Sequence, residues 1–401
     1  MPIIHIKQIL KERWEDFLFE HQNLIPEYVD NTIKKMLSCR DPEKLGYHKY
    51  ACHDHPDQFR IIPNTCKSNF CNSCGKILTD KFVSKVESNF PTTSFHHICF
   101  TIPDSLRTLL SKNRFLLNCL FKAASQTVLS FSKEKHFLPL VIAALHTFGR
   151  DLKFNPHIHL LISSGGLLLK DGLPTNKWKV CSFFPFKMLH KRYKFLLISI
   201  FKKTITSYLQ SNQNHTELSL FSNPAVLDSF FDPLLDINWY VHDSTEIPSD
   251  KFTVAYIVRY TKRPPIAESR ILYYGKLPHL HPEQIWVTFS YKQRNQPEVK
   301  WTLKVESFIY RLIIHILPPN FRQVRYYGLL SNRVRSKLLK VVLKLLHKQK
   351  QIKKFLSWRE RIIEFFGIDP LACPICKKTM KLVEFAYFSL KLDSLKVYHP
   401  P

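Results

Sequence analysis

Apolar residues recur at helical spacing in two segments near the N-terminus. Ile9, Trp14 and Phe17 would share one face of a helix, and residues 28–37 repeat the pattern, so we expect two amphipathic helices there. Pro42 ends this region, because proline has no amide hydrogen with which to continue a helix. The stretch that follows is poor in apolar side chains, so a hydrophobic core alone would not fold it.

The pattern changes near Phe95. Three runs of apolar and β-branched residues predict strands: HHICFTI at 96–102, LVIAALHTF at 140–148 and HIHLLISS at 157–164. Residues 106–133, between the first two runs, have helical periodicity. Strands and helices without a regular βαβ alternation predict an α+β fold on an antiparallel sheet.

Three further elements are expected towards the C-terminus. Residues 251–262 have a helical pattern, which Pro264 ends, and residues 285–303 have the pattern of a hairpin with a polar tip. Residues 333–361 carry eleven Lys or Arg and one acid. On a helix, four of these lysines would share one face: Lys337, Lys340, Lys344 and Lys348. Such a face is either solvated or bound to phosphate.

The charge of the whole chain favours phosphate. The 401 residues include 59 Lys and Arg against 32 Asp and Glu, which gives a net charge of +27. A surface of this kind binds polyanions, so nucleic acid is the first candidate and an anionic membrane the second. No apolar run is long enough to span a bilayer, and the first residues lack the pattern of a secretion signal. We therefore expect a cytoplasmic protein.

The ten cysteines are clustered. Four lie between residues 52 and 74, and two form Cys373-Pro-Ile-Cys376. In a long chain without a secretion signal, such clusters indicate metal ligands or buried thiols rather than disulfides. The later pair has no evident partner pair, so metal-binding, redox and structural interpretations all stay open for it.

The earlier cluster predicts a structural zinc site. Cys52-x2-His55 and Cys71-x2-Cys74 are separated by a loop, and a tetrahedral zinc ion takes two ligands from each such pair. Cys66 is a fifth candidate, which would replace His55, support the site or be idle. The alternative is a set of reduced core cysteines.

A second arrangement is Asn155-Pro156-His157-Ile158-His159. On a strand, His157 and His159 point to the same face and Ile158 to the other. Two imidazoles on one face can hold a divalent cation together with a third ligand. A His-x-His pair taken alone more often marks two ordinary histidines.

A third arrangement is the pair Tyr256 and Tyr260, which would share one face of a helix beside Arg259. Such a pair is commonly part of a packed core. A tyrosine can also attack a DNA phosphodiester when a cation polarises the phosphate. Paired histidines and a strongly basic surface together favour the second interpretation.

These motifs resemble those of the rolling-circle transposases of bacterial insertion sequences, the two-tyrosine HUH enzymes of the IS91 type. The resemblance covers nearly the whole chain, and the order and spacing of its motifs make it specific. The motifs are GYHKYAC, TCKSNFCNSCG, FHHICFTIPDSLR, TFGRDLKFNPHIHLLISSGG, YIVRYTKRPPIAESRI, ESFIYRLIIHILPPNFRQVRYYGLL and DPLACPIC.

The resemblance implies roles for individual residues. His157 and His159 would bind Mg²⁺ or Mn²⁺, and Tyr256 and Tyr260 would be nucleophiles that become linked to a 5′-phosphate. His97 is our candidate for the third metal ligand, with Glu268 as the alternative. Arg259, Lys262 and Arg263 would contact DNA. The partner would be DNA, as single strands of element ends and of the target, in the bacterial nucleoid.

The resemblance also suggests three domains. Residues 1–92 would form a helical, zinc-binding module that recognises DNA, residues 93–330 an HUH-type catalytic domain, and residues 331–401 a basic helical region. The chain departs from the family pattern twice. His55 stands where the family usually has Cys, and Lys377-Lys378 stands where it usually has Gly-Gly.

Two other functions compete with this interpretation. The first is a zinc-containing nucleic-acid-binding protein without catalytic activity, in which the tyrosines are only packed. The second is a transposase that uses three carboxylates to hold two metal ions. The acidic residues of this chain show no such arrangement, so we rank it last.

Overall fold

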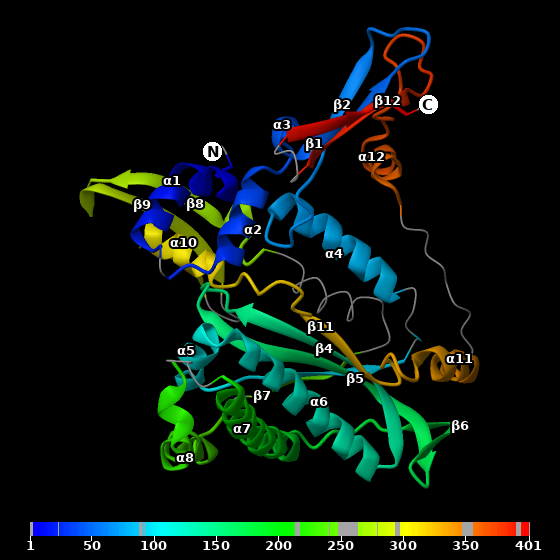
Figure 1. Cartoon of the computed structure of the whole chain (residues 1–401). Coiled ribbons are helices and arrows are strands. Elements are labelled where there is room, and N and C mark those ends of the chain that lie inside the picture. The colour runs from blue at the N-terminus through cyan, green and yellow to red at the C-terminus, as the bar shows by residue number, and fades with distance from the viewer. Residues whose placement is uncertain are drawn as a thin grey trace.

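The computed structural model describes residues 3–22, 24–87, 91, 93–212, 217–239, 241–247, 264–278, 280–292, 297–346, 356–389 and 394–400. Three antiparallel sheets with flanking helices make up this part of the chain (Figure 1). The expectation of an α+β fold is confirmed.

The largest sheet lies at the centre of the molecule. Its strands run in the order β11-β4-β5-β3-β7, and β6 pairs with the far end of β5. The expected strands near residues 96, 140 and 157 are β3, β4 and β5. The bounds are β3 Phe95–Phe100, β4 Phe137–Phe148, β5 Phe154–Lys170, β6 Leu173–Val180, β7 Val241–Ile247 and β11 Val324–Gly328.

Helices cover one face of this sheet. Ile98, Ile158 and Leu160 point to that face and pack against Phe131 and Phe201 of the helices. The expected helix 106–133 is divided at Asn113, which ends α5. The bounds are α5 Ser105–Lys112, α6 Leu117–Glu134, α7 Phe186–Ser211 and α8 Pro224–Phe231. The short 3₁₀ turns are Arg114–Leu116, Ser219–Ser222, Asp232–Leu235 and Glu268–Arg270.

Described residues cover the opposite face only in part. Apolar side chains of α4 (Asn72–Glu87) and α11 (Arg335–Leu345) pack on it, including Phe82, Leu338 and Val342. Towards the start of β5, the described side chains on this face include His146, His157 and His159.

The N-terminal helices α1 (Ile6–Glu20) and α2 (Glu27–Leu37) pack against residues far away in the chain. Trp14 and Phe17 share a core with Phe289 and Phe308 of a three-stranded sheet and its helix. This sheet contains the expected hairpin. The bounds are β8 Ile271–Leu277, β9 His281–Lys292, β10 Glu298–Lys304 and α10 Val305–Ile313. The domain boundary that we expected at residue 92 therefore divides segments that pack together in one core.

The third sheet joins the two ends of the chain. Its strand order is β13-β12-β1-β2, so a C-terminal strand pairs with a strand from the zinc segment (Figure 1). Residues 331–401 are therefore not a separate helical tail: α11 and α12 are followed by strands, because β12 finds its partner in β1. The bounds are α3 Pro42–Leu45, β1 Gly46–Ala51, β2 Phe59–Pro63, α12 Trp358–Phe366, β12 Lys381–Ser389 and β13 Ser394–Tyr398.

In the described part of the chain, no helix has the length and apolar character that crossing a bilayer requires.

Alanine substitutions at two glycines test the pairing of β1 with β12. Gly46 and Gly172 have φ angles of +81° and +78°, and a Cβ on Gly46 would lie 2.0 Å from the carbonyl oxygen of Ala386 in β12, whereas one on Gly172 meets nothing within 4 Å. A positive φ costs a residue with a side chain about 1–3 kcal/mol, and a forced shift of packed backbone costs about 1–3 kcal/mol more. We expect both costs in Gly46→Ala and only the first in Gly172→Ala.

Urea denaturation of the two variants measures this difference. Equal losses in the free energy of unfolding would show that β12 does not pack against Gly46.

Candidate functional site

The central feature of the site is the start of β5. Ile158 is fully buried beneath the helices, and strand alternation therefore turns His157 and His159 to the opposite face. The two imidazoles approach each other, with 3.1 Å between their Nε2 atoms. The sequence-based expectation for these three side chains agrees with this arrangement.

The spacing of the two imidazoles suits a shared metal ion. Nitrogens bound at about 2.1 Å and at a right angle, as in octahedral geometry, lie about 3.0 Å apart. The Nδ1 atom of His157 lies 2.6 Å from the carbonyl oxygen of Asn155. Because a carbonyl can only accept, Nδ1 donates, and Nε2 therefore carries the lone pair with which a neutral imidazole binds a cation.

His97 contacts the other side of the His159 ring. Its Nε2 lies 2.7 Å from Nδ1 of His159, whereas the Nε2 of His159 faces His157. An imidazole that binds a cation through Nε2 keeps its proton on Nδ1, and His97 accepts that proton. His97 is therefore placed to orient His159, not to be the third ligand that we expected.

Glu268 is engaged elsewhere. One of its oxygens lies 2.8 Å from Nδ1 of His5, and the other accepts a hydrogen bond from the backbone N–H of Ile6 at 3.3 Å. Glu268 thus holds the start of α1. It lines the same pocket as the histidines but does not ligate in this arrangement.

Sequence reasoning missed His146. It lies opposite His157 in the pairing of β4 with β5, and its ring centre is 4.2 Å from that of His159 and 5.4 Å from that of His157. In the sequence, His146 only interrupts an apolar run. The register of the two strands reveals its position, and a single sequence does not give that register.

Cys99 is a weaker candidate on the other neighbouring strand. It lies opposite His159, and its sulfur is within 4.8 Å of the donor nitrogens of His157 and His159. Burial raises the pKa of Cys99 to about 12, so its thiol stays protonated and is a poor ligand for a hard cation.

Burial also keeps His159 and His97 neutral. It is the main cause of a pKa of His159 well below the ordinary value, and His146, His157 and His97 act in the same direction. Burial, followed by His157, lowers the pKa of His97 to about 4. Neutral imidazole is the form that binds metal.

The histidines open onto a pocket of about 770 Å³. Lys76 of α4 contributes to its wall, as do Arg150 and Arg270. Pro264 and Pro265 line it too, and they directly follow the segment that carries the two tyrosines. Tyr256, Tyr260, Arg259, Lys262 and Arg263 themselves lie outside the described residues.

Two further hollows continue from this pocket. The second, of about 250 Å³, shares His146 and Pro264 with the first, and it shares Pro318 and Phe321 with the third. The third, of about 970 Å³, combines arginines and aromatic rings, and none of the described residues in its lining is acidic. Its lining includes Arg114, Arg322, Arg325, Arg335, Phe82, Phe115, Phe321, Tyr326 and Tyr327.

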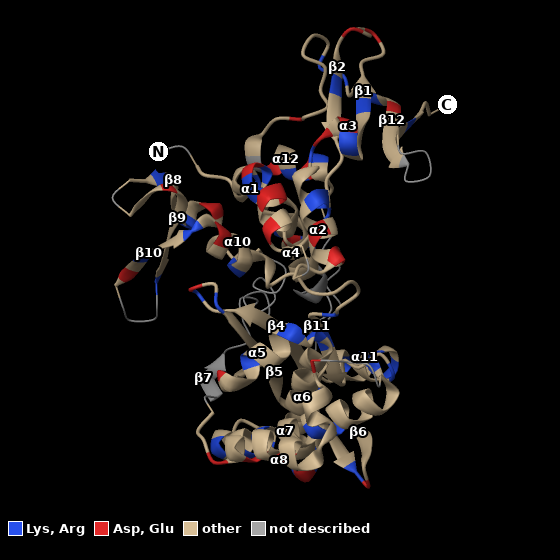
Figure 2. Ribbon diagram, turned by 60° about the vertical axis from the view of Figure 1, so that its left-hand side comes forward, with Lys and Arg blue, Asp and Glu red and all other residues tan. Residues whose placement is uncertain are grey.

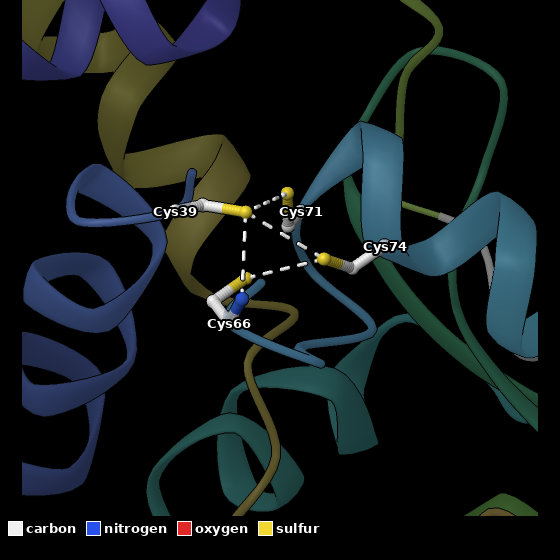
Figure 3. A group of neighbouring side chains, drawn as sticks. All are labelled: Cys39, Cys66, Cys71 and Cys74. Carbon is white, nitrogen blue, oxygen red and sulfur yellow. Dashed lines mark hydrogen bonds between the residues drawn. The ribbon is translucent and has the colours of Figure 1, made fainter. Parts of the chain in front are cut away.

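Four cysteines form a buried cluster beside the pocket (Figure 3). Cys39 lies 3.6 Å from Cys74 and 3.8 Å from Cys71, and Cys66 lies 3.6 Å from Cys74, measured between sulfurs. Sulfurs bound to zinc at about 2.3 Å in a tetrahedron lie about 3.8 Å apart. Hydrogen bonds from Cys66 and Cys71 lower the pKa of Cys39, which favours a thiolate there.

This cluster corrects our expectation of the zinc ligands. Cys71 and Cys74 are joined by Cys66 and by Cys39, which precedes the predicted site and belongs to no close pair in the sequence. Cys52 and His55 lie elsewhere, in a group with Cys373 and Cys376. The single site that we expected from Cys52, His55, Cys71 and Cys74 is therefore wrong.

The predicted basic face lies on α11. Lys337, Lys340 and Lys344 are exposed, while Leu338 and Val342 of the same helix pack on the central sheet. Figure 2 shows this helix in blue at its exposed side. Lys348 lies outside the described residues, and the helix ends at Leu345.

Comparison with known proteins gives relatives over most of the chain. Residues 141–337 match a family described as putative transposase, and residues 9–102 match a transposase zinc-binding domain. The transposase for insertion sequence element IS801 of Pseudomonas savastanoi pv. phaseolicola is 31% identical over 363 residues, which cover 87% of this chain and 82% of the relative. The putative transposase y4qJ of Sinorhizobium fredii is 26% identical over 353 residues, 83% of each chain. No solved structure matches.

Binding of Mn²⁺, measured by electron paramagnetic resonance, distinguishes a ligand from a positioning residue. We expect His157→Ala to abolish binding at this site, because one of its two closest donors is lost. His97→Ala should weaken it about 10- to 100-fold, the usual effect of losing a partner that orients a ligand. Equal loss in both variants would make His97 a ligand after all.

Proposed function

Because this chain belongs to the IS801 and IS91 type of insertion-sequence transposases, we propose that it cuts and rejoins single DNA strands through an intermediate in which a tyrosine is linked to a 5′-phosphate. Its substrates would be element ends in the bacterial nucleoid. The observation that carries the proposal is the position of His157 and His159. They face a pocket with cationic walls that also contains Pro264, four residues after Tyr260.

Each histidine has a distinct part in this proposal. His157 and His159 hold a divalent cation, His97 orients His159, and His146 is the third imidazole within reach. The bound cation would polarise the phosphate and stabilise the charge that develops on it. Since Mg²⁺ prefers oxygen ligands, nitrogen donors at this position favour Mn²⁺.

The tyrosines carry the covalent step. The hydroxyl oxygen of Tyr256 or Tyr260 forms a bond to phosphorus while the bond from phosphorus to the 3′ oxygen breaks. The phenol gives up its proton, and the departing 3′ oxygen takes one up and becomes a hydroxyl. The other tyrosine then allows a second transesterification while the first still holds DNA.

Lys76 would contact the phosphate. It is exposed at the start of α4 and lines the histidine pocket, and no ion pair of Lys76 with another described residue is present. Arg270 is already used by the protein, since it donates to the carbonyls of Ser290 and Arg150. Arg270 is half-buried, so its side chain shapes the wall of the pocket and is not offered to DNA.

The DNA strand would follow the three connected hollows. Arginines that track the backbone, with aromatic rings on which bases stack, are the usual means of binding single strands without reading sequence. In the third hollow, Arg335 lies over the ring of Tyr326 at 5.9 Å, and Arg322 is exposed. The second hollow is lined by Ser68, Asn69 and Phe70, so the loop between two zinc ligands would touch the strand.

The nucleophiles are tested with an element-end oligonucleotide labelled on the 5′-phosphate side of the cut. We expect a covalent adduct on a denaturing gel with Mn²⁺, and none with Tyr256→Phe/Tyr260→Phe, which lacks both hydroxyls. Tyr310→Phe is the control, because Tyr310 is 50% exposed on α10 and lies outside the pocket.

An adduct in the double variant would exclude these tyrosines. Tight binding by the wild type without an adduct, under any divalent ion, would instead indicate a non-catalytic zinc-containing DNA-binding protein.

The strand path is tested by affinity for single-stranded DNA. Arg322→Ala/Arg335→Ala should lower the affinity about tenfold and reduce the slope of log affinity against log salt by about one to two, because up to two phosphate contacts are lost. Lys203→Ala should have no effect, since Lys203 is on α7, which covers the other face of the sheet. If both variants bind as the wild type does, DNA does not use the third hollow.

A further inference from the structure

The two ends of the chain present ligating side chains to one another. β1 ends at Ala51, which pairs with Lys381 at the start of β12. The turn that leaves β1 carries Cys52 and His55, and the turn that enters β12 carries Cys373 and Cys376. Antiparallel pairing therefore brings two Cys-x2-Cys/His turns together, although they lie more than 300 residues apart in sequence.

Four donor atoms meet between these turns. The sulfur of Cys52 lies 3.5 Å from that of Cys376 and 3.8 Å from Nδ1 of His55. The sulfur of Cys373 lies 3.9 Å from the same nitrogen. All four donors lie within 4.8 Å of one another, and tetrahedral zinc with bonds of about 2.0–2.3 Å needs donors about 3.5–3.8 Å apart.

The backbone of the second turn has the geometry that this arrangement requires. Lys377 has a φ of +60°, so it adopts the left-handed conformation for which glycine is more usual. Its N–H donates to the carbonyl of Cys373, and the N–H of Cys373 donates to the carbonyl of Lys378. The tight turn is therefore kept although Lys377-Lys378 replaces two glycines.

The group of donors also lies at an end of the sheet where the described residues form only a small hydrophobic cluster. The only buried side chains in the cluster at this end are Cys52, Cys373 and Met380, among the described residues. Large apolar side chains of the same sheet are exposed, including Phe59 and Tyr387. A small sheet of this kind needs a metal in place of a hydrophobic core.

We propose that Cys52, His55, Cys373 and Cys376 bind a second structural zinc ion, which fastens the C-terminal strands to the N-terminal module. On binding, the three thiols lose their protons to solvent and His55 binds as the neutral ring. The site takes half its ligands from beyond residue 102, where the match to the zinc-binding domain ends. It does not depend on the transposase chemistry.

The proposal is tested by the zinc content of the full-length protein, measured by inductively coupled plasma mass spectrometry. We expect two zinc ions per wild-type chain and one in Cys373→Ser/Cys376→Ser. Cys39→Ser/Cys74→Ser should also retain one, because it removes only the other site. Cys181→Ser is the matched control and should retain two, since Cys181 belongs to neither group.

Two further variants separate metal binding from misfolding. His55→Cys should keep two zinc ions, because a fourth sulfur suits zinc, whereas His55→Ala should lose the second ion. Trypsin should cleave within residues 372–400 at least about tenfold faster in Cys373→Ser/Cys376→Ser than in the wild type. One zinc ion in the wild type, two in Cys373→Ser/Cys376→Ser, or a Cys52–Cys376 disulfide in the purified protein would overturn the proposal.

Discussion

The two-residue period of β5 is the constraint on which the site depends. Helices α6 and α7 require Ile158 and Leu160 for their core, so the residues between them must face the other side of the sheet. The pocket of about 770 Å³ lies on that side of the sheet. A shift of one residue in the pairing of β5 would turn His157 and His159 towards the helices and Ile158 away from them, so packing and site are set by the same register.

The cysteine cluster positions the part of the pocket wall that α4 contributes opposite the histidines. Its ligands come from the end of α2, from the loop before α4 and from the first turn of α4 (Figure 3). The cluster fixes the start of α4, which brings Asn72 and Lys76 to the pocket. The loop between Cys66 and Cys71 lines the next hollow. A zinc ion bound here would therefore shape the proposed DNA path without touching the reacting phosphate.

The sequence allowed prediction of features that depend on local spacing. The alternation around Ile158, the hairpin near residue 290 and the amphipathic face of α11 follow from periods of two or 3.6 residues. Features that depend on pairing between distant segments could not be predicted. Cys39 has no neighbouring ligand, and His146 meets His157 only through the register of β4. Cys373 and Cys376 appeared as half a site because β1, which pairs with β12, lies at the other end of the chain.

The most direct test is the anomalous scattering of Mn²⁺ in a crystal of the protein with a single-stranded element end. The account predicts a peak about 2.1 Å from the Nε2 atoms of both His157 and His159, next to a phosphate that the hydroxyl of Tyr256 or Tyr260 can reach. His97 should contact Nδ1 of His159 and not the metal ion. A peak away from this pair, or both tyrosines in a separate core, would contradict it.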